Sequence, residues 1–243
     1  YWNGNITDAR VVKGTQVYTS NFTPPAVPLT AVTNTKLLIQ NTDGGIIDRS
    51  QGQRRIKLMG DVKSSTTQNK FLSSSIKFDD NGDYILVKPA GTFSFGTGDF
   101  TVEYWIYYNA IGNYDYIYDG RNTSQTTGAW SVAHGYGGGN ATILQWASGG
   151  SVILTAASNP STNQWVHVAF CRSGSTLKLF YDGTENQSVT DTTNYSTNLT
   201  HSYFGCRHSV EHYLNAYLRD FRVTNGLARY TANFTAPTAA LKG

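Results

Sequence analysis

Charged residues are scarce in this 243-residue sequence, and acidic ones especially so. Asp, Glu, Lys and Arg make up only 14% of the chain, and just three residues are glutamates: Glu103, Glu185 and Glu211. Exposed helix surfaces favour Ala, Glu, Leu and Lys, so this composition argues against a helical protein and suits strands joined by turns. The formal net charge of +3 is spread along the chain without a concentrated basic patch, and we therefore expect no nucleic-acid partner.

Long apolar runs and cysteines are also few. No run approaches the roughly 18 residues of a membrane helix, so we expect no insertion into a membrane. The two cysteines, Cys171 and Cys206, permit at most one disulfide bridge. Both lie in predicted strands, which favours buried free thiols unless those strands are neighbours. A chain of this length can bury a full core as one or two domains.

One segment of the chain occurs twice. DFRVTNGLARYTANFTAP, from Asp220 to Pro237, matches DARVVKGTQVYTSNFTPP at a constant offset of 212 residues. Without any gap, Tyr1–Leu29 and Tyr213–Leu241 share 13 of 29 residues. A fixed period indicates a tandem array. We therefore predict that residues 1–29 are the C-terminal strand and tail of a preceding repeat, residues 30–36 a linker, and residues 37–243 a complete module.

Alternation of apolar and polar residues predicts many short strands. Phe100–Tyr107 carries large residues on both faces, which is typical of a central strand covered on both sides. A hairpin is predicted over residues 75–87, a first strand of the module over Leu37–Ile39, and a polar loop over residues 61–70. Further strands are predicted over Tyr114–Tyr118, Trp130–His134, Ile143–Trp146, Val152–Thr155, Gln164–Arg172, Thr176–Asp182, Tyr203–Cys206 and Leu214–Val223. This spacing, without a convincing helix, indicates an all-β sandwich or barrel.

Four stretches resemble the laminin-G-like, concanavalin-A-like jelly-roll family: KFDDNGDYILV, FGTGDFTVEYWIYY, WVHVAFCRSGSTLKLFYDG and YLRDFRVTNGLARYTANFTAP. They occur in the family's order, and the sequence is most similar to the tandem modules of bacteriophage tail fibres and related virion proteins, particularly those of marine phages. The resemblance implies an antiparallel jelly-roll sandwich at an extracellular or virion surface. It also implies that Arg229, Tyr230, Asn233 and Phe234 tie the last loop onto the sandwich. This fold carries lectins, enzymes and spacers alike.

Two patterns point towards hydrolases, and both are weak. His208-Ser209-Val210-Glu211-His212 matches the H-x-x-E-H pattern of zinc peptidases, but that chemistry needs a helix to place both histidines on one face. We expect a loop here, with incidental histidines; opportunistic metal binding together with His201 stays open. Glycoside hydrolysis needs two carboxylates about 5–10 Å apart. Jelly-roll hydrolases carry these carboxylates in an E-x-D-x-x-E run on one strand. The strand of Glu103 has no such run and supplies only one carboxylate, so we predict no catalytic residues.

The resemblance also suggests a possible calcium site, because laminin-G-like domains often hold calcium at one rim. Asp119 lies where one such ligand could fall, without a second aspartate that can be matched to it. Asp79, Asp80 and Asp83 could surround an ion, yet Asp is an ordinary residue of tight turns. We therefore assign no metal site and no cofactor, and calcium stays open.

The richest binding region is the stretch from Tyr107 to Trp146, where aromatic residues alternate with Gly, Asn and Asp. Aromatic faces and planar polar groups are what sugar recognition requires, while Tyr-, Gly- and Asn-rich loops also suit protein receptors. Strand aromatics are alternatively core residues, and Tyr136, in a loop, is expected to be more exposed. The predicted ligand-binding residues are Tyr116, Asp119, Arg121, Asn122, Trp130, Tyr136 and Trp146.

Three functions remain open from the sequence. The first is attachment, in which the module binds a cell-surface polysaccharide or a protein receptor and repetition raises avidity. The second, nearly as well supported, is a structural repeat that contacts neighbouring modules or copies of itself. The third, a polysaccharide depolymerase, rests on the fold alone and is disfavoured by the missing carboxylate pair.

Overall fold

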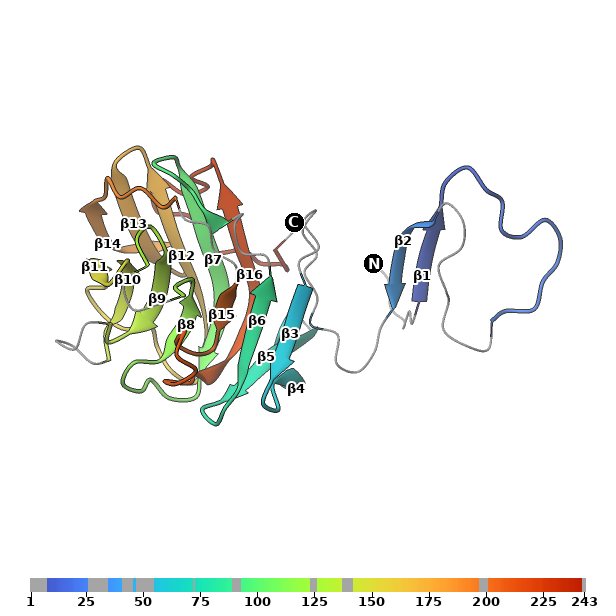
Figure 1. Ribbon diagram of the computed structural model, residues 1–243, viewed down its shortest axis with the longest axis horizontal. Coiled ribbons are helices and arrows are strands. Elements are labelled where there is room, and N and C mark those ends of the chain that lie inside the picture. Colours follow the sequence, from blue (N-terminus) through green and yellow to red (C-terminus); the bar gives the residue numbers. More distant parts are fainter. Residues whose placement is uncertain are drawn as a thin grey trace. The chain divides into compact units, whose positions relative to one another are not determined.

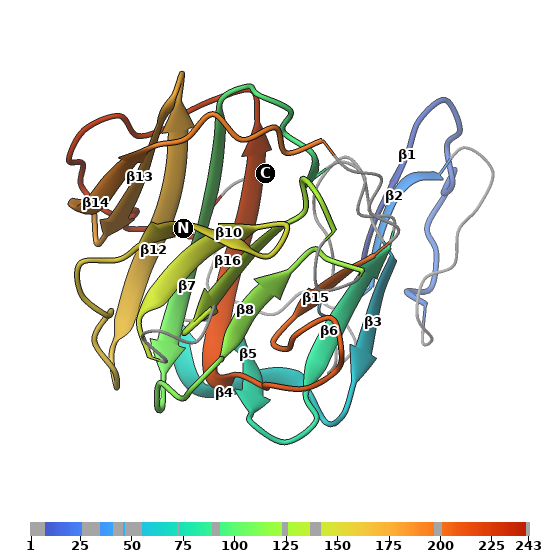
Figure 2. The same cartoon turned by 60° about the vertical axis from the view of Figure 1, so that its left-hand side comes forward.

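The computed structural model describes residues 8–25, 35–40, 46, 55–71, 73–88, 93–122, 126–136, 142–196 and 201–241. The chain forms two compact units, Tyr1–Gly45 and Ile46–Gly243. The second unit is a sandwich of two antiparallel sheets, each with seven strands, whose layers are visible in Figures 1 and 2. The predicted all-β jelly-roll sandwich is confirmed.

The two sheets are named here after one central strand of each. The β8 sheet contains, in spatial order, β11 (Ser151–Thr155), β10 (Leu144–Ser148), β9 (Trp130–His134), β8 (Tyr116–Asp119), β15 (Ser202–Phe204), β6 (Tyr84–Lys88) and β3 (Arg55–Met59). The β7 sheet contains β14 (Thr184–Thr190), β13 (Thr176–Tyr181), β12 (Trp165–Ser173), β7 (Phe100–Tyr108), β16 (Asn215–Asn225), β5 (Ser73–Asp79) and β4 (Lys63–Lys70).

The strand β7 is central, as its two apolar faces predict. It pairs with β12 on one side and with β16 on the other. Phe100, Val102 and Tyr104 point into the core between the sheets and are fully buried. Glu103 lies on the opposite face of the strand and is buried as well. A second layer of chain must therefore cover the outer face of the β7 sheet.

Aromatic rings fill the space between the two sheets. The indoles of Trp130 and Trp146 lie parallel with ring centroids 4.7 Å apart, and Phe100 stacks on Trp146 at 5.3 Å. Both indole N–H groups donate hydrogen bonds, that of Trp130 to the carbonyl of Phe93 and that of Trp146 to the hydroxyl of Tyr195. Burying each such side chain contributes about 2–3 kcal/mol, so these rings stabilise the sandwich.

Three strands differ from the sequence prediction, and two of them, β4 and β14, carry no apolar alternation. Residues 61–70, predicted as a polar loop, contain β4, whose backbone pairs with β5 at the edge of the β7 sheet. The strands β3 and β14 were missed, and each lies at the edge of its sheet. An edge strand is held by backbone hydrogen bonds to one neighbour, and polar side chains suit it because they discourage edge-to-edge association.

The first unit contains β1 (Asp8–Val12) and β2 (Thr35–Gln40), which pair antiparallel. The strand predicted over Leu37–Ile39 therefore exists, but it pairs with β1 and not with a strand of the sandwich. The sandwich unit begins at Ile46.

The outer face of the β7 sheet is covered by the segment that follows β16. Tyr230 and Phe234 stack there and pack against a small cluster of Ala169, Cys171 and Phe180. The side chain of Asn233 accepts a hydrogen bond from the backbone N–H of Glu185 at 2.8 Å. The structure thus confirms that the final loop is tied to the sandwich.

Two further sequence expectations concern cysteines and membranes. Cys171 and Cys206 are both buried and free, and burial raises the pKa of the Cys171 thiol to about 11. Cys206 lies in the loop after β15 rather than in the strand predicted for it. Within the described part of the chain, no helix is long and apolar enough to span a membrane.

Candidate functional site

A buried ion pair lies where β8 ends, on the outer face of the β8 sheet. Asp119 is the last residue of the strand, and Arg121, two residues later, folds back onto it. The guanidinium donates through Nε to Oδ1 of Asp119 at 2.8 Å and through Nη2 to Oδ2 at 2.7 Å. Asp119 is fully buried, and Arg121 is 2% exposed. A bidentate, charge-assisted contact of this kind has strong geometric specificity.

Asp119 also receives hydrogen bonds from two other segments. Ser131 of β9 donates its hydroxyl to Oδ1 at 2.8 Å, and the backbone N–H of His208 donates to Oδ2 at 3.0 Å. Burial alone raises the pKa of Asp119, but hydrogen bonds from His208 and Arg121 together with the charge of Arg121 outweigh it, and the pKa falls to about 2. The carboxylate is therefore ionised and serves as the anchor of three segments.

The same contacts occupy the carboxylate that the sequence suggested as a possible calcium ligand. Both carboxylate oxygens face N–H and O–H donors, and one donor group is a guanidinium in direct contact. A cation would have to displace that positive charge from a buried position, at a large electrostatic cost. Both oxygens of Asp119 are thus engaged by protein donors, which argues against calcium at this carboxylate.

Arg121 extends the network to two tyrosines. Its Nη1 donates to the hydroxyl of Tyr136 at 2.7 Å, and its Nη2 donates to that of Tyr116 at 3.2 Å. The guanidinium carbon also lies 4.8 Å from the ring centroid of Tyr136 and 5.5 Å from that of Tyr116. Tyr136 lies two residues after the end of β9, so Arg121 links the chain that leaves β9 to the end of β8.

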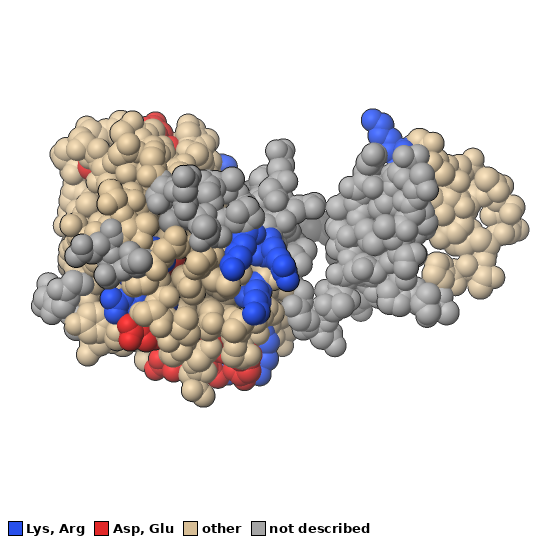
Figure 3. All heavy atoms as spheres, viewed as in Figure 1, with Lys and Arg blue, Asp and Glu red and all other residues tan. Residues whose placement is uncertain are grey.

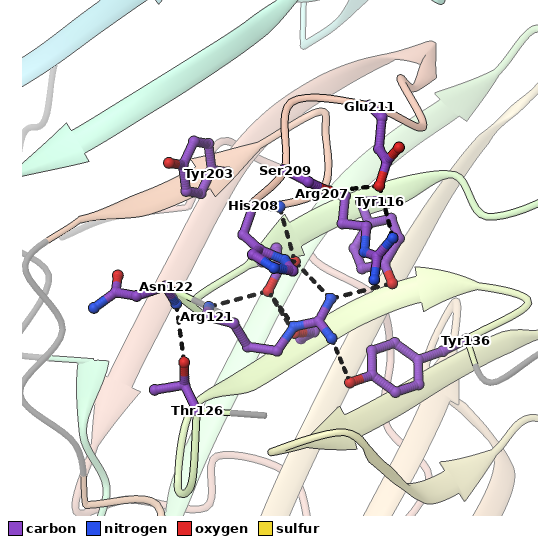
Figure 4. Close-up of polar contacts among 12 residues, drawn as sticks. Tyr116, Arg121, Asn122, Thr126, Tyr136, Tyr203, Arg207, His208, Ser209 and Glu211 are labelled. Atoms are coloured by element: carbon purple, nitrogen blue, oxygen red, sulfur yellow. Dashed lines mark hydrogen bonds and ion pairs between the residues drawn. The ribbon is translucent and has the colours of Figure 1, made fainter. Parts of the chain in front are cut away.

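The loop between β15 and β16 forms the third wall of the site. Arg207 donates to the carboxylate of Glu211 at 2.7 Å, and Ser209 donates to the same oxygen at 2.6 Å (Figure 4). Val210 and His212 both have positive φ, at 61° and 58°. The loop is therefore a tight turn, which buried Asp119 holds through His208.

This turn separates the two histidines of the H-x-x-E-H pattern. His208 approaches Asp119, with Nδ1 at 3.3 Å from Oδ2. The ring of His212 packs instead against Tyr114, with centroids 5.0 Å apart. A zinc peptidase requires both imidazoles on one helix face, and the positive φ at His212 is not helical. The predicted loop is confirmed. His208 was expected to be incidental, but it contacts the buried carboxylate of Asp119.

The predicted ligand-binding residues divide into three groups. Tyr116, Asp119, Arg121 and Tyr136 do come together, in the network just described, but Tyr136 is only 4% exposed, contrary to the exposure expected for it. Asn122 is exposed, with its backbone N–H donating to Thr126 Oγ1 at 3.1 Å.

The two tryptophans of the predicted site belong to the core. Trp130 and Trp146 are fully buried between the sheets, with their N–H groups already bonded. Their assignment as ligand-binding residues is wrong. On β9 and β10 alternate side chains face opposite ways, and both indoles point inward, away from the face that carries Asp119.

Solvent-accessible groups surround the buried pair. We call them the rim: Asn122, Arg207, Ser209, Glu211 and His212. The side chains of Arg207 and Glu211 are 29% and 49% exposed, and the ring of His212 with that of Tyr114 forms a partly exposed aromatic surface beside them. No local sequence pattern marks Arg207 or Ser209 as site residues, because the loop that carries them meets Asp119 from about ninety residues away. The E-H ending of the H-x-x-E-H pattern was the only local sign.

A second buried carboxylate, Glu103, lies on the outer face of the β7 sheet. Its Oε1 accepts from Nε and Nη2 of Arg222 at 3.0 and 2.7 Å, and its Oε2 accepts from the hydroxyl of Tyr230 at 3.0 Å. The Nε2 atom of His167 lies 3.2 Å from Oε2. Burial raises the pKa of Glu103, but the contacts with His167 and Arg222 lower it overall. A general acid needs a raised pKa, so this geometry belongs to an ion pair.

Three aspartates form a separate group at one end of the sandwich. One oxygen from each of Asp61, Asp79 and Asp83 lies within 4.8 Å of the others, and Asp80, included in the sequence prediction, is not among them. Lys63 approaches Asp61 to 3.5 Å. The carboxylate of Asp79 accepts from Asn81 N at 3.1 Å, which is the turn chemistry expected of this stretch.

The sequence model of one family, Laminin_G_3 of the concanavalin A-like lectin/glucanases superfamily, matches residues 79–229. The chain belongs to this superfamily. A search of curated protein sequences finds no match to it. The assignment to the superfamily therefore depends on residues 79–229, which include Glu103 and Asp119.

Solved structures with the superfamily fold include binding domains. The binding domain of Paraclostridial Mosquitocidal Protein 1 is 18% identical, with a TM-score of 0.56 over 75% of this chain and 47% of that one. A botulinum neurotoxin type C, whose cell entry depends on interaction with two ganglioside molecules, is 15% identical, with a TM-score of 0.55 over 74% and 46%. The chain thus spans about half the length of these toxin domains.

A third similar structure is a domain of a glycosidase. Domain 4 of AbnA, a GH43 extracellular arabinanase from Geobacillus stearothermophilus, was solved in complex with arabinotriose. It is 15% identical, with a TM-score of 0.53 over 72% of this chain and 84% of that domain. At these identities the likeness establishes the fold.

Proposed function

We propose that this chain is a non-catalytic attachment module of an extracellular or virion-surface fibre, which binds a glycan or a protein receptor on a host surface. The superfamily includes lectins, and the similar structures include toxin binding domains and a domain in complex with an oligosaccharide. Those ligands belong to those proteins. For this chain they support a carbohydrate as the first ligand class to test.

The observation that carries the proposal is the rim, held in place by the buried pair of Asp119 and Arg121. Sugar recognition combines planar polar groups, which bond to hydroxyls, with an aromatic face that packs on C–H groups. The rim offers the carboxylate of Glu211, the guanidinium of Arg207 and the amide of Asn122 beside the His212 ring. Because Asp119 fixes the loop that carries three of these groups, they are preorganised, which reduces the entropy lost on binding.

The surface around these groups is otherwise weakly charged. On the face drawn in Figure 3, most of the described surface belongs to uncharged residues; basic side chains gather in one group, and acidic side chains with further basic ones lie along the lower edge. Neutral polysaccharides and glycolipid headgroups suit such a surface better than highly charged polymers do. We therefore place neutral or singly charged glycans first among the expected ligands.

The test is a glycan array, together with a pull-down of whole host cells, using the full chain displayed on beads. Multivalent display is needed because one module is expected to bind weakly. The variant with Arg207→Ala and Glu211→Ala should lose at least tenfold in apparent affinity. Its matched control carries Lys178→Ala and Glu185→Ala, which removes a similar exposed ion pair from the β7 sheet.

The outcomes separate the alternatives. Binding that is lost in the rim variant and kept in the control supports the proposal. A blank array and pull-down at high module density overturn it. If released oligosaccharides accumulate in the supernatant, the chain is a depolymerase, and the non-catalytic assignment fails.

A second function, that of an assembly repeat, is favoured by one observation. The first unit carries a stacked pair of aromatic rings, Tyr18 and Phe22, on an exposed segment. Attachment does not explain this pair.

A further inference from the structure

The final segment of the sandwich shows how its outer face is completed. After β16 the chain turns at Gly226, where φ is +79°, and lies over the β7 sheet. Tyr230 and Phe234 stack with centroids 3.6 Å apart and an interplanar angle of 5°. The two rings meet His167 edge-on, at 6.3 and 5.8 Å. We call residues 226–237 the closing segment, because it separates Glu103 and His167 from solvent.

The closing segment is also fixed by its backbone. The N–H of Phe234 donates to the carbonyl of Gly183 at 2.8 Å, in the turn between β13 and β14. A Cβ at Gly183 would lie only 1.9 Å from the carbonyl oxygen of Phe234, so the two backbones approach as closely as glycine allows. The segment therefore fits this face by aromatic packing, by the Tyr230–Glu103 hydrogen bond and by main-chain contact.

Residues 14–25 reproduce this conformation in the first unit. Tyr18 and Phe22, offset by 212 residues from the other pair, stack at 3.7 Å with an interplanar angle of 8°. Gly14, which corresponds to Gly226, has φ of +84°. A strand precedes each segment, β1 in one case and β16 in the other. Sequence identity and backbone geometry thus agree at the turn and at both rings.

The surroundings of the two segments differ completely. Tyr18 and Phe22 are 40% and 53% exposed, and every residue from 13 to 25 is exposed. Tyr230 and Phe234 are instead partly buried against the sheet. Tyr18 and Phe22 thus hold the conformation that Tyr230 and Phe234 adopt on a sheet, but no sheet face among the described residues packs against them, and the two rings are open to water.

That face must belong to another sandwich, because the closing segment of this chain already fills its own. In this chain the closing segment follows, along the polypeptide, the strands that it covers. We propose that residues 14–25 close a preceding sandwich of the same type, docking on a sheet face that presents a buried glutamate and histidine like Glu103 and His167. The partner is thus a repeat located before Asp8, and its outer face lies partly under this chain's first unit.

The chemistry of the docked state follows from the conserved positions of the repeat. Tyr18 takes the place of Tyr230 and donates its hydroxyl to the glutamate. Asn21 takes the place of Asn233 and accepts a backbone N–H from the strand that corresponds to β14. Arg10 corresponds to Arg222 in the sequence of the repeat. The first unit is then an inter-repeat joint.

A graft in the full chain tests the fit. Residues 226–237 are replaced by residues 14–25, which changes Leu227, Ala228, Arg229, Ala232 and Ala236 and keeps both rings. The grafted chain should melt within about 3 °C of the parent. The matched control is the same graft with Tyr230→Ala and Phe234→Ala, which should melt about 5–10 °C lower. Melting of both grafts at the same low temperature overturns the proposal.

A peptide of residues 8–25 tests docking without covalent connection. It is added to the full chain carrying Tyr230→Ala and Phe234→Ala, whose face is open, and to the parent, whose face is filled. The peptide should raise the melting temperature of the open variant only, and a peptide with Tyr18→Ala and Phe22→Ala should not raise it. No rise at millimolar peptide overturns the proposal.

Sedimentation of the parent chain distinguishes a preceding repeat from a second copy. We expect a monomer. A dimer that is lost with Tyr18→Ala and Phe22→Ala assigns the segment to another copy and overturns the intrachain joint. All of these readouts measure stability or association, so they do not depend on whether the rim binds a glycan.

Discussion

The two outer faces of the sandwich each bury a carboxylate in a bidentate contact with arginine, but they are covered in different ways. Glu103 is covered by a separate stretch of chain, with Tyr230 and Phe234 on top of it. Asp119 is covered by the side chains and turns of its own neighbouring loops. One face is therefore sealed by polypeptide, while the other ends in a rim of accessible polar groups. The difference separates a surface used for closure from a surface available to a ligand.

The largest expected effect compares the two arginines. Arg121→Leu leaves Asp119 as a buried charge without its cation, which costs about 3–5 kcal/mol of unfolding free energy. Arg222→Leu should cost about 1.5–3 kcal/mol, because Arg222 is more exposed and Glu103 keeps Tyr230 and His167 as partners. Urea denaturation of both variants measures the difference. Equal losses would show that the two centres are equivalent.

A smaller effect compares the two tyrosine hydroxyls. Tyr136→Phe removes the acceptor of a buried guanidinium N–H and should cost about 1.5–2 kcal/mol. Tyr230→Phe removes one donor to Glu103 at a partly exposed position and should cost about 0.5–1 kcal/mol. Thermal unfolding monitored by circular dichroism is sufficient. A larger loss for Tyr230→Phe would contradict the assignment of the more buried network to the β8 sheet.

The third effect uses pH to compare the two carboxyl groups that flank β8. Burial raises the pKa of Asp115 to about 6, whereas that of Asp119 is about 2. For Asp115 the folded state holds the proton that the unfolded state releases, so its contribution to stability falls as pH rises from about 4 to 6. For Asp119 the sign is opposite, and stability is lost as pH falls from about 4 towards 2.

Asp115→Asn isolates the first of these contributions. The Asn side-chain oxygen still accepts from the backbone N–H of Gly112, as Asp115 does at 2.7 Å. Relative to this variant, the parent should lose about 1–2 kcal/mol of unfolding free energy between pH 4.5 and 7. Urea titrations at four pH values provide the measurement. A difference that stays constant across that range would contradict the raised pKa.

The smallest effect on stability is expected at the rim. Exposed ion pairs contribute about 0–1 kcal/mol, so Arg207→Ala with Glu211→Ala should change the unfolding free energy by about 0.5 kcal/mol or less. The same variant should lose ligand binding at least tenfold. Loss of binding with intact stability would establish the rim as a contact surface. A large drop in melting temperature would instead show that the pair holds the loop.

The sequence predicted the fold because the central strands carry the signal. Phe100–Tyr107 alternates large residues on both faces, and the structure places it between β12 and β16 with both faces buried. The polar edge strand β4 could not be predicted, because its stability comes from backbone pairing with β5 and not from its side chains.

The candidate site could be predicted only in part, for a related reason. Asp119, Arg121 and Asn122 lie close together in a stretch rich in aromatic and polar residues, so the local sequence was enough to predict them as site residues. The sequence of β9 and β10 does not show which side chains face the core and which face outward. Trp130 was therefore predicted at the surface, although it lies in the core. The contact of Asp119 with His208 joins segments 89 residues apart, and no local pattern encodes it.

The position of β16 in the chain has a consequence for biosynthesis. This strand lies between β7 and β5, yet among the described strands of the sandwich it is the last to be translated. Until residue 225 has left the ribosome, the β7 sheet remains two separate parts with unpaired inner edges, so the sandwich is completed only near the end of its synthesis. Such exposed edges promote aggregation. A polypeptide terminated a few dozen residues early would therefore lack the strand that joins the sheet and become a substrate for chaperones and proteases.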